Sequence, residues 1–470
     1  MNWIIDLRVA SLVGLCELRY SSTELNFGDV MGFNDCAGGI IFSSRMWVDF
    51  KIRRVAWFFP ASNGEKMSFK VVAIRLVSPG VLFEKINRNR FQKIVFQMTP
   101  VQKFLIAPDK FKGSLSARAA AEAMAAGVLR VHPDADLDIC PIADGGEGFM
   151  ETLAPGLDAR WVTCAAVDAL GRPVESRYLL AETPQGLTAI LEMAETAGLW
   201  RLTATERNPA QTTTRGTGMQ MVHAAQNDGV VRIILGLGGS ATHDGGAGMA
   251  AALGHLFIDE NGVNDDPRAS NLGEIRAIDF GRRVDLPEII AACDVDNPLL
   301  GARGATAVFS GQKGASVLDQ PSLENALAHL VAVSEGHSAA DIPGAGAAGG
   351  LGFGLLHFAG ASLVSGFDLI SSLLGLEARI AAADHVLTGE GSLDYQSLSG
   401  KGPVGLARLA QTLGIPVTAF CGVADDEARG SVLFHALHAL TDSGLPLDRL
   451  IAEASPLLTD AVANAKFFKP

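Results

Sequence analysis

A glycine-rich stretch that follows an apolar run limits the fold more than any other part of this chain. Residues 230–235 read Val-Val-Arg-Ile-Ile-Leu, and residues 238–248 read Gly-Gly-Ser-Ala-Thr-His-Asp-Gly-Gly-Ala-Gly before a helix of small residues over 249–253. A buried strand, a glycine turn and a helix N-terminus bring backbone N–H groups and the positive end of the helix dipole to one point. The pattern therefore predicts an anion site, although a turn selected only for packing has the same pattern.

The residues inside this stretch suit a phosphate and its counter-ion. Four glycines would let the backbone approach a ligand closely: Gly238, Gly239, Gly245 and Gly246. Three side chains between them carry oxygen atoms of the kind that binds Mg²⁺: Ser240, Thr242 and Asp244.

The first hundred residues differ in composition from the rest. They hold 13 Lys and Arg against 8 Asp and Glu, whereas the whole chain has a net charge of −13. Their apolar segments show neither the 3.6-residue periodicity of a helix nor the alternation of a strand. We expect residues 1–97 to be an extension that is non-native, through a start codon assigned upstream of Met98, or disordered; a small accessory domain is the alternative. No function is assigned to them.

Composition excludes several classes of protein. The chain has 470 residues, of which 48% are hydrophobic and 19% charged, as in globular proteins of two or three domains. Its acidity argues against nucleic-acid binding and against an anionic membrane surface. The six scattered cysteines form no CxxC pair, which favours reduced thiols. No signal peptide or membrane span is evident in the sequence, so we expect a cytoplasmic protein. This expectation is compatible with a homo-oligomer.

Charged or polar loops follow further predicted strands. Strand 103–107 precedes a loop with Lys110, Lys112 and Ser114, and a helix capped by Ser116. Strand 137–140 precedes Asp144 and Glu147, which suit a metal ion or form a capping box for the next helix.

The same pattern recurs along the chain. Thr214 and Arg215 open a helix and suit bidentate capture of a carboxylate, or form an ordinary cap with a surface arginine. Asp294 and Asn297 follow strand 289–293, where Asp294 suits a base, a metal ligand or a helix cap. The loop Gly389-Glu390-Gly391 follows strand 385–388. Alternating strands and helices predict a layered α/β protein with parallel sheet.

Together these loops favour phosphoryl transfer, which needs positioning and charge neutralisation. Neither a Walker loop nor the motifs of protein kinases are present. Residues 106–116, Ile-Ala-Pro-Asp-Lys-Phe-Lys-Gly-Ser-Leu-Ser, closely resemble the opening of the bacterial glycerate kinase family, of the glycerate 2-kinase type. Seven later motifs match that family in order: 143–148, 214–218, 238–248, 293–298, 311–314, 343–350 and 388–391. Lys110 and His243 depart slightly from the family pattern.

The resemblance implies ATP- and Mg²⁺-dependent phosphorylation of D-glycerate to 2-phosphoglycerate, with 3-phosphoglycerate less expected, in organic-acid catabolism. It also implies two α/β domains. A flavodoxin-like domain would combine residues 102–165 and 383–470, and the second domain, 166–382, would be inserted in it with the glycine-rich phosphate loop.

Roles for single residues are hypotheses added to this resemblance. Asp294, Lys112 and Arg215 would be catalytic, with the two cations on the glycerate carboxylate and Asp294 on the attacking hydroxyl. The glycine-rich loop and residues 389–391 would bind ATP, and Asp144 or Glu147 would bind Mg²⁺. Glycerate would also contact four further residues: Lys110, Ser114, Thr214 and Asn297.

Three other functions fit parts of the sequence. Residues 236–241 match GxGxxA, and Asp259 lies where the ribose-binding acid of an NAD-linked dehydrogenase stands. A serine hydrolase would require the GxSxG glycine that residues 238–242 lack. A metabolite-binding protein without activity is the third alternative.

Overall fold

The computed structural model describes residues 101–143, 145–146, 148–281, 283–394 and 402–467, together with the backbones of four strands nearer the N-terminus. Residues 1–102 form one compact unit and residues 103–470 another. In the first unit, β1 (Ile4–Ser11) pairs with β2 (Gly14–Ser21) and β3 (Cys36–Phe42) pairs with β4 (Met46–Ile52), both antiparallel. The prediction for residues 1–97 falls mostly outside the described residues and stays a prediction.

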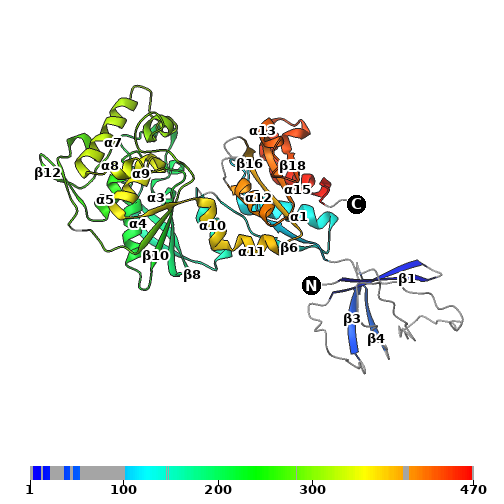
Figure 1. The fold of residues 1–470 in the computed structure, drawn as a ribbon. Helices are drawn as coiled ribbons and strands as arrows, with labels where there is room; N and C mark the ends of the chain where they lie inside the picture. The colour runs from blue at the N-terminus through cyan, green and yellow to red at the C-terminus, as the bar shows by residue number, and fades with distance from the viewer. Residues whose placement is uncertain are drawn as a thin grey trace. The chain divides into compact units, whose positions relative to one another are not determined.

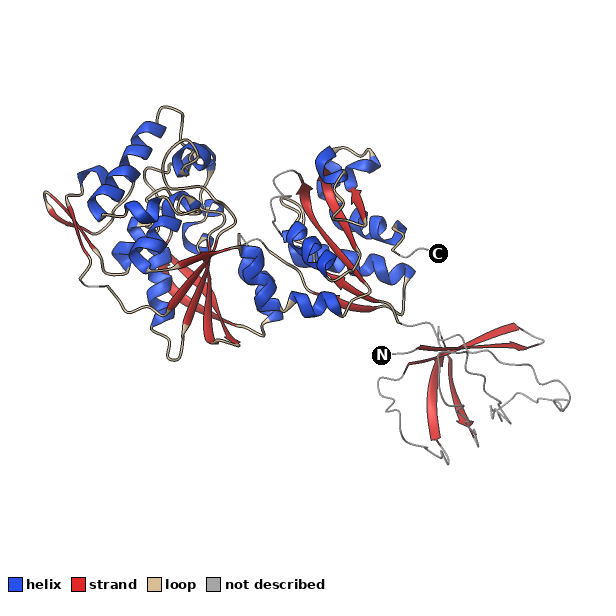
Figure 2. Ribbon diagram, viewed as in Figure 1, coloured by secondary structure: helices blue, strands red, loops and turns tan. Residues whose placement is uncertain are grey.

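The second unit contains a five-stranded sheet of order β18-β17-β16-β5-β6, in which all neighbours are parallel (Figures 1 and 2). Its strands come from both ends of the unit: β5 (Lys103–Ile106), β6 (Asp136–Ile139), β16 (His385–Leu393), β17 (Val417–Ala424) and β18 (Ala436–Ala439). Counted along the chain, the order is 2-1-3-4-5, which is that of flavodoxin-like sheets. The predicted flavodoxin-like sheet built from both ends is confirmed.

Helices cover both faces of this sheet. Phe104 and Ile106 of β5 pack in one buried cluster with side chains of α1 (Ala117–Val131) and α15 (Ala454–Asn464). Leu105 and Ala107 pack in another cluster that includes side chains of α12 (Gly402–Thr412). A continuous apolar strand is what a parallel sheet buried on both faces requires. The first helix, α1 (Ala117–Val131), begins as predicted after Ser116, whose side chain accepts the N–H of Ala119.

A six-stranded mixed sheet has the order β15-β14-β10-β9-β8-β7. Its first four strands run parallel, and the last two pair antiparallel. The strands are β7 (Arg160–Val167), β8 (Pro173–Thr183), β9 (Gly186–Glu192), β10 (Arg232–Gly236), β14 (Glu288–Ala292) and β15 (Ser362–Val364). Residues 160–165 therefore belong to this sheet, so the predicted boundary at 165 lies too far along the chain. The pairing of β7 with β8 overrides it.

A separate antiparallel sheet of order β12-β11-β13 was not predicted. Its strands are β11 (Leu256–Asp259), β12 (Gly262–Asn264) and β13 (Ala277–Asp279). They form where the chain leaves the six-stranded sheet after α5 (Ala247–Ala252).

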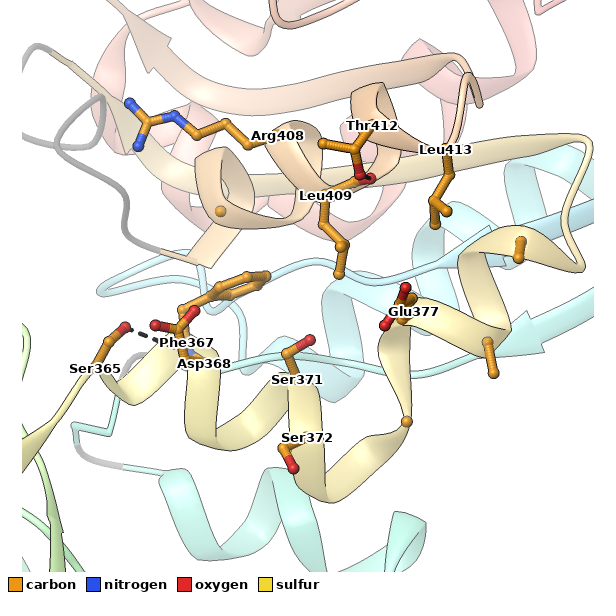
Figure 3. Close-up of a pocket in the computed structure, with 14 residues that line it drawn as sticks. Ser365, Phe367, Asp368, Ser371, Ser372, Glu377, Arg408, Leu409, Thr412 and Leu413 are labelled. Atoms are coloured by element: carbon orange, nitrogen blue, oxygen red, sulfur yellow. Dashed lines mark hydrogen bonds between the residues drawn. The ribbon is translucent and has the colours of Figure 1, made fainter.

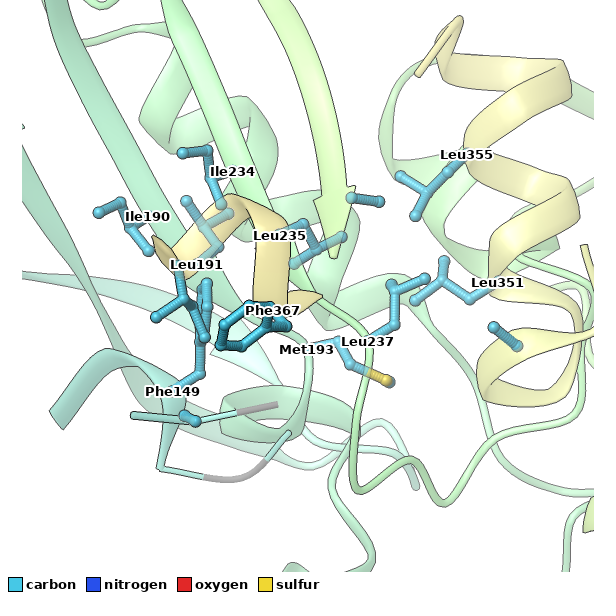
Figure 4. Close-up of a cluster of buried hydrophobic side chains, with 14 of the residues drawn as sticks. Phe149, Ile190, Leu191, Met193, Ile234, Leu235, Leu237, Leu351, Leu355 and Phe367 are labelled. Atoms are coloured by element: carbon cyan, nitrogen blue, oxygen red, sulfur yellow. The ribbon is translucent and has the colours of Figure 1, made fainter. Parts of the chain in front are cut away.

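The remaining helices pack around the two larger sheets. They are α2 (Phe149–Gly156), α3 (Ala194–Ala197), α4 (Arg215–Ala225), α5 (Ala247–Ala252), α6 (Ala305–Phe309), α7 (Gln320–Ser334), α8 (His337–Ala340), α9 (Ala347–Gly354), α10 (Gly366–Leu374), α11 (Leu376–Ala381), α12 (Gly402–Thr412), α13 (Asp426–Arg429), α14 (Leu447–Ala452) and α15 (Ala454–Asn464). Figure 4 shows apolar side chains of β9 and β10 beside Phe149 of α2, Phe367 of α10 and Leu351 of α9. This core holds the ends of the strands in place, and the loops of the candidate site begin at these ends.

Candidate active site

The order of the five-stranded sheet reverses between β5 and β16, and ligands of such sheets bind where the order reverses, beyond the carboxyl ends of the strands. The loops after these two strands lie in contact there. The N–H of Asp109 donates to the carbonyl of Gly389 at 2.8 Å. A Cβ added to Gly391 would lie 2.8 Å from the backbone nitrogen of Lys112, so only glycine allows this approach.

The loop after β5 presents its lysines at this edge. Lys112 is exposed and Lys110 half-buried, while Asp109 is buried. The hydroxyl of Ser114 donates to the carbonyl of Phe111 at 3.1 Å and so closes the turn. Lys112 therefore reaches solvent, and its contact with an anion stays a prediction.

A second loop, 140–148, runs from β6 of the five-stranded sheet to the carboxyl edge of the six-stranded sheet. The N–H of Ile142 donates to the carbonyl of Pro108, and the N–H of Gly238 donates to that of Gly145, at 3.0 and 3.2 Å. A Cβ on Gly238 would lie 2.2 Å from Cα of Gly146. These contacts bring the loops after β5, β6, β10 and β16 together.

Asp144 and Glu147, the two predicted metal ligands, lie outside the described residues. Their neighbours are placed: a Cβ on Gly145 would meet the methyl group of Ala292, at the end of β14, at 3.0 Å. Among the described residues, no three His, Cys, Asp or Glu side chains gather where they could hold a metal ion.

Glu192, which the sequence interpretation did not single out, anchors the far end of this loop. It ends β9 and is 4% exposed. Its two carboxylate oxygens accept the N–H groups of Gly148 and Met150 at 3.1 and 3.4 Å. Burial raises the pKa of Glu192 to about 7, and the nearby Glu151 adds to the rise. An acid that ends an otherwise apolar strand is the sequence feature that could have indicated it.

The glycine-rich loop divides into an outer and an inner half. Gly238 and Ser240 are half-buried and Gly239 is exposed, whereas 241–250 are buried throughout. The loop is held laterally, because Leu199 donates to the carbonyl of Gly239 and Ala241 donates to that of Ala197. Within the described part of the chain, the N–H groups of Gly239 and Ser240 have no protein acceptor. The outer half therefore offers two unused donors at a surface turn.

The inner half contains three residues predicted to bind the cofactor: Thr242, Gly245 and Gly246. A Cβ on Gly246 would lie 2.8 Å from Cα of Gly354, and one on Gly245 would lie 2.5 Å from the side chain of Leu330. In this structure these residues shape the turn from inside, and their contact with a nucleotide stays a prediction.

Asp244 joins the glycine-rich loop to the start of α4. It is fully buried, which raises its pKa, and it accepts the N–H and hydroxyl of Thr214 at 2.7 and 2.8 Å. It also accepts the N–H groups of Gly246 and Gly248, each at 3.2 Å. The hydroxyl of Thr214 in turn accepts the N–H of Met249. The polar atoms of Thr214 are thus used within the protein.

Arg215 follows as the first residue of α4 and is half-buried. Its guanidinium donates to the carbonyl of Asp265. The guanidinium has further donors beyond this bond, so an anion can still bind to it.

Asp294 and Asn297 follow β14. One carboxylate oxygen of Asp294 accepts the N–H of Gly366, the first residue of α10, at 2.8 Å. The side-chain amide of Asn297 donates to the carbonyl of Arg303 at 2.7 Å, and the backbone carbonyl of Asn297 accepts the N–H groups of Gly344 and Gly346. Both residues hold neighbouring turns in place. The N-cap of α10 is Ser365 and not Asp294, and the role of Asp294 stays a prediction.

A cavity of about 1060 Å³ lies between α10, α11 and α12 (Figure 3). Ser365, Asp368, Glu377 and Arg408 supply most of its polar lining, and it contains none of the predicted site residues. The candidate site is accordingly a set of loops and not this cavity.

The strand pairing removes the physical basis of the dehydrogenase alternative. The ribose-binding acid of such enzymes ends the next parallel strand. Asp259 ends β11, which pairs antiparallel in the separate small sheet, and its carboxylate accepts the N–H of Asn261. Within the described residues, no helix is both long and apolar enough to cross a membrane.

A flavodoxin-like sheet and a mixed sheet, with glycine turns in contact at their carboxyl edges, define a two-sheet α/β protein whose candidate site lies at those turns. The family model described as "Glycerate kinase family" matches residues 104–468, and the chain belongs to that family. It is accordingly a kinase that acts on an alcohol group.

Known proteins and a solved structure are similar to this chain over most of its length. A glycerate kinase of Bacillus subtilis is 39% identical over 78% of this chain and 98% of its own length. A glycerate 2-kinase of Escherichia coli is 40% identical over 72% of this chain and 89% of its own length. A crystal structure described as a glycerate kinase 2 of Salmonella typhimurium LT2 has a TM-score of 0.66 and 36% identity, and covers 78% of this chain and 97% of that chain.

Proposed function

We propose that this protein transfers the γ-phosphoryl group of ATP to the 2-hydroxyl of D-glycerate, with Mg²⁺, in organic-acid catabolism. The names of the relatives support glycerate as the substrate, and the glycerate 2-kinase supports the position. The structural observation that carries the proposal is the contact of Gly238 with Gly145 and Gly146, because it joins loops of both sheets into one candidate site.

ATP would bind through its phosphates to the outer half of the glycine-rich loop. The two unused N–H groups, of Gly239 and Ser240, are the donors that an anion at such a turn requires. Thr242, Gly245 and Gly246 would support this half from inside. The loop 389–391 would contact the nucleotide from the five-stranded sheet.

Mg²⁺ would be held by Asp144 or Glu147. Carboxylate oxygens are suited to this ion, and the two acids belong to the loop that contacts Gly238, so the donor chemistry fits. When bound, the ion would neutralise charge on the phosphates.

Glycerate would bind by its carboxylate to Lys112 and Arg215, whose side chains reach solvent. Lys110, Ser114, Thr214 and Asn297 would shape this pocket, the last three through the turns that their hydrogen bonds close.

Asp294 would accept the proton of the attacking hydroxyl. The glycerate oxygen then forms a bond to the γ-phosphorus as the bond to the oxygen of ADP breaks. The N–H of Gly366 donates to the carboxylate of Asp294 and holds it in one orientation. General-base catalysis of this kind contributes about 10²–10⁴-fold.

The test is Asp294→Asn with Asp296→Asn as its matched control, since Asp296 is exposed and paired with Arg303. Asp294→Asn should lower kcat about 10²–10⁴-fold with KM for glycerate nearly unchanged. The control should keep wild-type kcat. An unchanged kcat in Asp294→Asn removes this residue from the mechanism, and coupling the product to enolase alone identifies the phosphoglycerate isomer.

A further inference from the structure

Lys313 is a buried lysine to which the proposed chemistry assigns no task. It ends a short helix, η4 (Gly311–Lys313), and is 1% exposed. Its ammonium donates to the carbonyl oxygen of Thr242 at 2.7 Å. A buried ammonium is costly unless it is compensated, so its presence beneath the glycine-rich loop requires a physical explanation.

The compensation comes from the loop itself. Asp244, two residues beyond Thr242, is also fully buried, and its charge attracts Lys313. Burial lowers the pKa of Lys313 to about 7, and the attraction to Asp244 opposes this fall. The buried His243 also lies near enough to feel the charge of Lys313, and its Nε2 lies 3.0 Å from the hydroxyl of Thr306.

The Thr242 carbonyl is confined from a second side. A Cβ on Gly349 would lie 2.0 Å from this oxygen, so the chain of α9 passes directly against it. Within the described residues the hydroxyl of Thr242 has no hydrogen-bond partner. Lys313 is therefore the side chain whose hydrogen bond fixes the direction of this peptide group.

We propose that Lys313 is a positioning residue, whose ammonium holds the Thr242 carbonyl inward and thereby fixes the turn that presents the N–H groups of Gly239 and Ser240. Only Ala241 lies between Thr242 and the outer half, and its N–H donates to the carbonyl of Ala197. A peptide plane that turns at Thr242 would thus change the direction of the N–H groups before it. This inference rests on the proposed function, because it assigns those N–H groups to ATP.

The experiment replaces Lys313 by Met, which keeps most of the side-chain volume and removes the ammonium. KM for ATP, KM for D-glycerate, kcat and the melting temperature are measured on the full chain, with Lys466→Met as control because Lys466 is exposed. Lys313→Met should raise KM for ATP at least tenfold and leave KM for glycerate within twofold. Calorimetric titration with ATP alone should show the same loss of affinity, and the control should match the wild type.

Lys313→Gln retains amide donors, so its KM for ATP should lie between those of the wild type and of Lys313→Met; if the Met variant does not fold, the Gln variant decides alone. An unchanged KM for ATP, or equal rises in both KM values, overturns the inference. A wild-type protein that does not phosphorylate glycerate with ATP overturns the proposed function instead.

Discussion

Replacing Glu192 by Gln tests the anchoring of the loop that contains both predicted metal ligands. Glu192 is buried at the end of β9, and burial raises its pKa from the ordinary value of 4.5 to about 7. In the folded protein the carboxyl group therefore keeps its proton over a pH range in which the unfolded chain has lost it. The folded state binds more protons than the unfolded state between these two pKa values, so its stability falls as the pH rises through this window.

The magnitude follows from the two pKa values. They differ by about 2.5, and each pKa unit corresponds to about 1.4 kcal/mol, so the free energy of unfolding should fall by about 3 kcal/mol between pH 4.5 and pH 7. Gln does not titrate, and the Glu192→Gln variant should lack this contribution. The difference between the two proteins should become constant only well above pH 7, where Glu192 is deprotonated in the folded state as well.

The assay is urea unfolding of the wild type and of Glu192→Gln at several pH values from 4.5 to 8. The quantity compared is the pH dependence of the difference in unfolding free energy between the two proteins. Its absolute value is not used, because Gln also alters the hydrogen bonds to Gly148 and Met150. Glu182→Gln is the control, because Glu182 is exposed on β8. A difference between wild type and Glu192→Gln that stays constant over this range refutes the reasoning.

Two further substitutions test the loop contacts. Gly238→Ala places a Cβ 2.2 Å from Cα of Gly146, so kcat/KM should fall at least tenfold, whereas Gly273→Ala, where nothing lies within 4 Å, should match the wild type; equal activities of the two variants contradict the contact. Thr214→Val removes the hydroxyl that donates to Asp244, and urea unfolding should show a loss of about 1–3 kcal/mol. A loss well below this range would mean that Asp244 finds another donor.

Much of the layered architecture could be predicted, because an apolar run in the sequence indicates each buried strand and a polar or glycine-rich loop marks its end. The runs before Asp109, Gly238 and Asp294 are β5, β10 and β14, and the chain order of strands and helices indicated parallel pairing. What this pattern could not give is which sheet a strand joins, since β7 is assigned by its partner β8 alone.

The division of the glycine-rich loop could not be predicted for a different reason. A glycine required by a ligand and a glycine required by another backbone look the same in a sequence, and Gly246 meets Gly354, more than a hundred residues away. Lys313 lies in the family-like motif 311–314, but its burial could not be predicted, because the burial of a lysine depends on the surrounding fold. Asp144 and Glu147 lie outside the described residues, so their assignment stays a prediction.

The discontinuous flavodoxin-like sheet has a consequence for synthesis of the protein. The hydroxyl of Thr388 donates to the carbonyl of Ala107 across 281 residues of chain. At about 5–20 residues per second, the ribosome would need on the order of 15–60 s between these two points. During that interval β5 has β6 as its only strand neighbour from the mature sheet, so its opposite edge stays open to aggregation or to a chaperone until β16 emerges.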